Sequence, residues 1–139
     1  MVGLNVTRQN RMTPDDVEIL KKMGNPVADF AAQILSFTAG MNGRTGLCDA
    51  CAVSWLVDPD IITKCGMVHV DVETKGEFTR GMTVCDWREY MGKDPKEDIA
   101  HEKQFVQWNP TPNVEVALEF NEERFRQVLF DTIESYGRQ

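Results

Sequence analysis

The sequence predicts an α/β fold, in which helices and strands alternate along a single domain. Two observations carry this prediction. Several stretches have apolar residues at helical spacing behind residue types that cap helices, and others alternate apolar with polar residues, as half-buried strands do. The chain has 139 residues, which is enough for one domain with a buried core and too few for two domains of ordinary size.

The first helix signal lies at Thr13 and Pro14. Residues 1–6, before it, have the composition of the end of a buried strand. Thr13 is a good capping residue, Pro14 suits the first helical position, and two acidic residues follow near the positive end of the helix dipole. Gly24 is expected to end this helix.

A second helix is expected from Asn25 and Pro26. Its predicted apolar face consists of Val27, Phe30, Ala31, Ile34, Leu35 and Thr38. Residues 40–46 contain three glycines and are expected to form a flexible loop. A third helix over residues 50–57 is expected to be capped by Asp49 and to end at residues 58–60.

The second half of the chain predicts three strands and a final helix. Apolar and polar residues alternate over residues 68–73, a turn is expected at 74–76, and a second strand over 78–85 is interrupted by Gly81. Residues 88–112 are charged and contain three prolines, so we expect a long excursion with a short helix. Residues 114–120 alternate again, and Asn121 is expected to cap the last helix, which Gly137 closes.

Composition and charge restrict the function. The net charge is −7, and most of the negative excess lies in residues 71–139, so an acidic chain without a basic stripe argues against nucleic acid as a partner. There is no apolar run of membrane-spanning length and no signal-peptide core at the start, so we expect a cytoplasmic protein that does not bind membranes. In that location the four cysteines are expected to be thiols.

The stretch over residues 46–53 is the most informative for chemistry, because a loop delivers a thiol, Cys48, and a carboxylate, Asp49, to the start of a helix. Asp49 has two interpretations, a helix cap or an oxygen ligand for a hard cation. The spacing of Cys48 and Cys51 is that of half a zinc site or of a thioredoxin-type redox pair. No second close cysteine pair supports zinc, and no apolar strand leads into the pair as a redox motif requires.

Five segments, in order and in register, resemble the inosine-uridine nucleoside hydrolases. They are Gly3-Leu4-Asn5-Val6-Thr7, Gly24-Asn25-Pro26-Val27, Cys48-Asp49-Ala50-Cys51-Ala52-Val53-Ser54-Trp55-Leu56, the Val70–Gly76 run and the Thr79–Asp86 run. The resemblance implies a partial nucleoside-hydrolase fold with a Rossmann-like open sheet. It covers only the C-terminal part of the family's usual length, so residues 1–139 are expected to be the C-terminal portion of a single hydrolase domain.

The resemblance also implies an activity, hydrolysis of the N-glycosidic bond of ribonucleosides to ribose and free base. In that family a calcium ion holds the ribose diol and a water, an aspartate takes a proton from the water, and groups near the base assist its departure. Asp49 matches a calcium ligand. Cys48 stands where many members have a histidine that assists the base. The family's N-terminal aspartate cluster has no counterpart in this sequence.

Two alternatives stand beside the hydrolase. One is a catalytically silent fragment whose role is assembly or binding, and the other is a thiol redox module using Cys48 and Cys51. As a portion of a larger sheet, the chain is expected to expose apolar surface. Its expected partners are therefore a small-molecule nucleoside and either further copies of itself or the missing N-terminal part.

Overall fold

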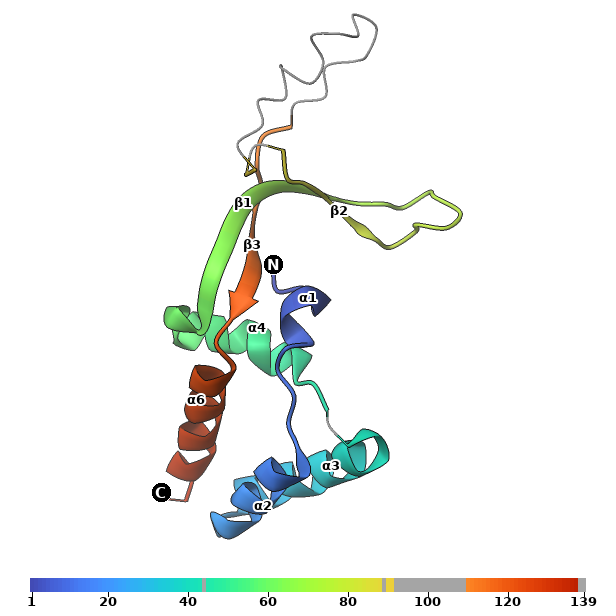
Figure 1. Ribbon diagram of the computed structural model, residues 1–139. Helices are drawn as coiled ribbons and strands as arrows, with labels where there is room; N and C mark the ends of the chain where they lie inside the picture. Colours follow the sequence, from blue (N-terminus) through green and yellow to red (C-terminus); the bar gives the residue numbers. More distant parts are fainter. Residues whose placement is uncertain (44, 89, 92–109, 138–139) are drawn as a thin grey trace, which may run out of the picture. The chain divides into compact units, whose positions relative to one another are not determined.

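The computed structural model describes residues 1–43, 45–88, 90–91 and 110–137, in two compact units (Figure 1). The helical unit comprises Val2–Lys64 and Ala117–Gln139, and the hairpin unit comprises Met1 and Cys65–Val116. The short helix expected within 88–112 falls largely outside the described residues. None of the described helices is both long and apolar enough to span a membrane.

The described part of the helical unit contains the four helices that the sequence predicted and two short ones that it did not, α1 and a 3-10 helix. In chain order they are α1 (Leu4–Thr7), α2 (Pro14–Lys22), α3 (Pro26–Asn42), α4 (Cys48–Val57), the 3-10 helix Pro59–Ile61 and α6 (Glu122–Ser135). The mixture of helices with an open sheet confirms the predicted fold class.

Three predicted helix starts are confirmed because their capping bonds are local. Thr13 and Asp16 form a reciprocal capping box at the start of α2. Asn25 accepts a hydrogen bond from the backbone N–H of Ala28, at 2.9 Å, and begins α3. Asn121 does the same for α6, accepting from the N–H of Arg124 at 3.0 Å. Each bond satisfies a backbone donor that the first helical turn leaves free.

Three other predictions at the ends of elements were wrong. Residues 1–6 are not the end of a strand; α1 forms there, and the Gly3 carbonyl accepts from two later N–H groups, so the backbone is satisfied locally. The loop expected at 40–46 starts at Gly43, whose φ of 69° ends α3 in the left-handed region. Helix α4 begins at Cys48, behind Leu47, so Asp49 lies inside the first turn and does not cap it.

The sheet has the order β2-β1-β3, with β1 (Ile62–Val72), β2 (Thr83–Asp86) and β3 (Val114–Phe120). β1 and β2 are antiparallel, with His69 opposite Asp86. The N–H of Asn113 donates to Val68 and that of Asn121 donates to Ile61, so β3 also runs antiparallel to β1. β2 is shorter than predicted because Gly81, with φ 87°, belongs to the preceding turn.

All the described helices of the helical unit, with the adjoining ends of β1 and β3, contribute to its core. Its largest cluster contains Met12, Val17, Leu20, Ala28, Ala32, Leu35 and Ile133. The predicted apolar face of α3 was wrong for Val27, Phe30 and Ile34, because the face that packs on the core carries Leu35 together with three alanines, Ala28, Ala32 and Ala39. Val27, Phe30, Ile34 and Phe37 instead form an exposed stripe along α3. The expectation of exposed apolar surface is confirmed.

Candidate functional site

The candidate site lies at the start of α4, where the sequence placed Cys48 and Asp49. Both side chains are exposed and both belong to the first helical turn. No side chain caps this helix, in contrast to α2, α3 and α6. The positive end of the α4 dipole is therefore accompanied by one carboxylate, Asp49, and one thiol, Cys48.

A pocket of about 380 Å³ opens beside Cys48. Its other walls come from α1 and the segment after it. The residues that line it are Thr7, Arg8, Arg11, Gly46 and Cys48. Gly46 passes close to the backbone carbonyls of Thr7 and Asn10, which closes the wall between the two segments. The pocket is of the size that binds small molecules.

Cys51, one turn along α4, plays a different part from Cys48. It is buried, and its sulfur accepts a hydrogen bond of 2.9 Å from the Asn10 side-chain amide. Burial raises the pKa of the Cys51 thiol. The buried position and the bond from Asn10 support a packing role for Cys51.

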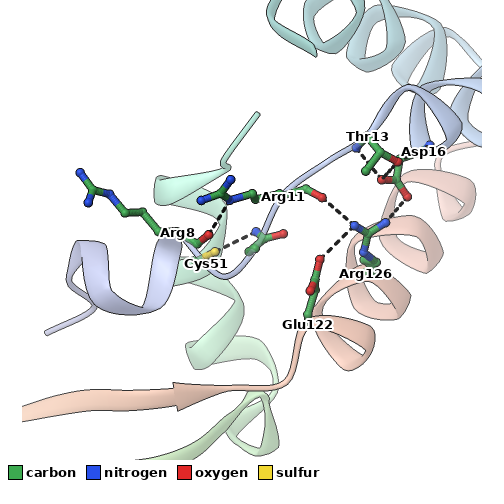
Figure 2. A network of polar contacts seen from close by, with 8 residues as sticks. Arg8, Arg11, Thr13, Asp16, Cys51, Glu122 and Arg126 are labelled. Carbon is green, nitrogen blue, oxygen red and sulfur yellow. Dashed lines mark hydrogen bonds and ion pairs between the residues drawn. The ribbon is translucent and has the colours of Figure 1, made fainter. Parts of the chain in front are cut away.

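The segment that forms the pocket wall is anchored from the opposite side by Arg126 of α6 (Figure 2). The Arg126 guanidinium pairs with Asp16 of the α2 capping box and with Glu122, and it donates a 2.6 Å hydrogen bond to the carbonyl of Arg11. Arg11 folds back so that its Nε donates to the carbonyl of Arg8 at 2.8 Å. Residues 8–12 are therefore fixed between α4 and α6.

The start of α4 offers oxygen donors of the kind that calcium binds, but not enough of them for a whole site. Calcium takes about six to eight oxygen ligands, several of them carboxylates. Within the described part of the chain no group of three or more acidic, histidine or cysteine side chains is placed to bind a metal. Asp49 offers one exposed carboxylate of the right chemistry. The residues described here fit one ligand position of a calcium site and do not form the whole site.

Sequence reasoning named Cys48 and Asp49 as candidate site residues but did not point to the residues that lie around them in the structure. Arg8, Arg11 and Asn10 reach the site from a segment about forty positions earlier in the chain. In the sequence they are only two basic residues and one amide that follow the Gly3–Thr7 segment directly. Nothing in their spacing relates them to α4, so only the tertiary structure could assign them.

Solved structures with the same arrangement of elements are nucleoside hydrolases. A purine-preferring ribonucleoside hydrolase from Gardnerella vaginalis matches 98% of this chain and 39% of its own, with a TM-score of 0.70 and 23% identity. A plant nucleoside hydrolase matches 96% of this chain and 40% of its own, with a TM-score of 0.71 and 21% identity. At this level of identity the similarity establishes the fold.

Sequence comparison establishes the family. The profile described as inosine-uridine preferring nucleoside hydrolase matches residues 1–127, so the chain belongs to this family. The pyrimidine-specific ribonucleoside hydrolase RihA of Klebsiella pneumoniae subsp. pneumoniae is 37% identical over 103 residues, which are 68% of this chain and 32% of the relative. The chain therefore spans about a third of the length of the curated relatives that it matches.

Proposed function

We propose that this chain supplies the C-terminal part of a nucleoside hydrolase that cleaves the N-glycosidic bond of ribonucleosides to ribose and free base. The observation that carries the proposal is the family match over residues 1–127, together with a small-molecule pocket at the segment that includes Cys48. In this proposal residues 1–139 are one portion of a single hydrolase domain. All four cysteines are free thiols, which supports the cytoplasmic location included in the proposal.

Cys48 is the residue that we assign to the leaving base. Its side chain is exposed and lines the pocket, whereas that of Cys51 is buried behind it. When the bond between C1′ and the base nitrogen breaks, both electrons go to the base, so negative charge builds on the leaving ring. A thiol that keeps its proton can donate it to that ring, a contribution of about 10²–10⁴-fold in general acid catalysis.

Asp49 is the residue that we assign to calcium. Its carboxylate is exposed at the first turn of α4 and is a hard oxygen ligand. Bound calcium supplies fixed positive charge to hydroxyl groups and to a water molecule. Asp49 supplies one ligand, and we propose that the other carboxylates and the base that deprotonates water come from another polypeptide segment.

The exposed apolar faces support the existence of such a segment. The α3 stripe, Val27, Phe30, Ile34 and Phe37, is exposed along its length, and on α4 the side chains of Val53, Leu56 and Val57 are exposed. Contiguous apolar surface of this kind is typical of a protein–protein contact. We propose that the covering polypeptide corresponds to the part of the longer relatives that this chain lacks.

Complementation tests this proposal. The isolated chain is expected to hydrolyse neither inosine nor uridine, with or without calcium, because one carboxylate cannot assemble the site. Co-expression with the region of the Klebsiella pneumoniae relative that has no counterpart in this chain is expected to give a complex with calcium-dependent hydrolysis. Phe30→Asp and Phe37→Asp, on the exposed stripe, are expected to prevent the complex.

Two other results of that experiment would contradict the proposal. Hydrolysis by the isolated chain would show that it needs no complement. A stable complex without hydrolysis would favour the second candidate function, a silent assembly or binding fragment, which the single carboxylate at α4 and the exposed stripe also fit. Sedimentation of the isolated chain measures whether it self-associates, and so distinguishes a homo-oligomer from both of these cases.

Substrate comparison in the active complex tests the two assigned residues. Cys48→Ala is expected to slow hydrolysis of nucleosides, whose bases leave poorly, far more than that of nitrophenyl riboside, whose leaving group needs no proton. Asp49→Ala is expected to slow both substrates alike, because it removes a metal ligand that both need. Equal losses for both substrates in Cys48→Ala, or no loss, would reject the proton-donor role.

A further inference from the structure

The pocket beside Cys48 is positively charged, although the chain as a whole is acidic. Two of the residues that line it, Arg8 and Arg11, carry guanidinium groups, and no described lining residue carries a carboxylate. Figure 2 shows both arginines on the segment that runs past Cys51. The net charge of the whole chain is −7, so this pocket is a local concentration of positive charge.

The arginines are placed by bonds that leave much of their donor capacity free. The Arg11 Nε donates to the carbonyl of Arg8, and the Arg11 carbonyl is in turn fixed by Arg126. Among the described residues neither guanidinium forms an ion pair with a carboxylate. A guanidinium carries five N–H donors, so both side chains can still bind an anion in the pocket.

A third observation concerns Thr7 at the pocket wall and the start of α4. Thr7 lines the same pocket and is 3% exposed, and its hydroxyl has no hydrogen-bond partner in the described structure. The Thr7 oxygen has almost no accessible surface, so it lies behind the pocket wall and is not counted as a ligand contact. Helix α4, which also starts here, has no capping side chain, so its positive end is directed to the same place.

From these three observations we propose that the pocket is an anion site in which Arg8 and Arg11 bind the negative charge of a nucleobase. The inference rests on the proposed function for the identity of the anion. When C1′ exchanges its bond to the base nitrogen for a bond to water oxygen, the electron pair leaves with the base, which is an anion until it takes up a proton. Arg8 and Arg11 stabilise that anion, and Cys48 lies at the same wall to return the proton.

Alkylation of Cys48 measures the anion preference of the pocket in the isolated chain, without any hydrolysis. The thiol is treated with iodoacetate, which is anionic, or with iodoacetamide, which is neutral, and the modified Cys48 peptide is quantified by mass spectrometry. The ratio of the iodoacetate rate to the iodoacetamide rate reports the local charge, because the thiolate attacks the carbon of either reagent and displaces iodide, so its abundance cancels in the ratio. We expect this ratio to be about five times higher at Cys48 than at Cys65, which is the size of effect that partly exposed charges have on a nearby ion.

Cys65 is a matched reference within the same molecule. It is exposed like Cys48, and its thiol lies 3.0 Å from the Glu115 carboxylate, so an anionic reagent is disfavoured there. The double variant Arg8→Gln, Arg11→Gln is expected to lower the ratio at Cys48 and to leave that at Cys65 unchanged. Lys22→Gln, Lys75→Gln removes the same charge from exposed residues that do not line the pocket and is expected to change neither ratio.

A second measurement on the unmodified chain identifies the ligand class. Orotate, a pyrimidine that carries a carboxylate, is expected to slow alkylation of Cys48 by iodoacetamide at millimolar concentration. Uracil, which is neutral at the same pH, is expected to protect much less, and neither is expected to protect Cys65. This protection measurement uses the unmodified chain, so it tests the anion site even where the arginine variants fail to fold.

Equal reagent ratios at Cys48 and Cys65, or a ratio at Cys48 that the arginine variants do not change, would overturn the anion site. Protection by orotate and uracil alike would overturn its preference for charge. Both results are independent of complementation, since no hydrolysis is measured. A failure of the anion site is therefore distinguishable from a failure of the proposed hydrolase.

Discussion

In the helical unit, apolar side chains from several helices meet in buried clusters, whereas the described part of the hairpin unit buries only two apolar side chains, Val68 and Val116. The hairpin unit relies on local polar bonds instead. Glu73 accepts from two backbone N–H groups in its turn, and the Asn113 amide bonds the backbone of Val70 in both directions. We therefore expect the stability of the helical unit to depend mainly on the packing of buried side chains, and that of the hairpin unit to depend mainly on its polar bonds.

The largest expected effect is a core truncation in the helical unit. Phe125 is 1% exposed and packs against Phe120, with ring centroids 5.4 Å apart. Phe125→Ala is expected to lower the free energy of unfolding by about 3–5 kcal/mol. Phe78→Ala removes the same atoms from a hairpin-unit side chain that is 90% exposed, and is expected to change it by less than about 0.5 kcal/mol. Urea denaturation followed by circular dichroism compares the two, and similar losses would remove the contrast between the units.

The next effect concerns the buried ion pair of the helical unit. Arg126→Met leaves the Asp16 carboxylate, whose side chain is 4% exposed, without its charge partner and frees the Arg11 carbonyl. We expect a loss of about 3 kcal/mol in urea denaturation. Arg124→Met, two positions earlier on α6, breaks a more exposed pair with Asp58 and is expected to destabilise the helical unit much less than Arg126→Met does. A loss for Arg124→Met as large as that for Arg126→Met would show that burial does not govern these pairs.

A smaller effect is expected from the cap of α6. Asn121→Ala removes the acceptor for the Arg124 N–H and is expected to destabilise the helical unit by about 1 kcal/mol. Asn121→Ser keeps a capping oxygen and is expected to recover most of the loss. Gln127→Ala, at an exposed position on the same helix, serves as the control in the same denaturation series. Failure of the serine to rescue would indicate that Asn121 acts through packing.

The smallest expected effect is a pH dependence confined to the hairpin unit. The Thr111 carbonyl, at 2.8 Å, and the Asp71 carboxylate, at 3.0 Å, raise the pKa of His69, and Asp86 acts in the same direction. Because the folded pKa is raised, this stabilisation is complete below the ordinary imidazole pKa and is lost as the pH rises through the folded pKa of His69. NMR titration should place its midpoint above the ordinary value, and Asp71→Asn should lower it. A midpoint at the ordinary value would show that these bonds do not persist in solution.

The sequence by itself determined the features that depend on neighbours in the chain. Thr13, Asn25 and Asn121 cap their helices through bonds to residues three positions later, so their identity was enough to place the helix starts. The alternation over residues 114–120 identified β3 in the same way. The ordered motifs that resemble the nucleoside hydrolases gave the family, because several segments in register are more specific than any one of them.

Only the tertiary structure decided which surfaces are buried and which residues share a site. α3 is apolar on two faces, so the pattern could not tell which one packs on α2, and in the structure the face with Ala28, Ala32 and Leu35 does so. Asp16 and Arg126 are 110 positions apart, and the segment of Arg8 and Arg11 meets Cys48 across some forty residues. Such pairings arise from the free energy of packing distant segments, which no local pattern in the sequence encodes.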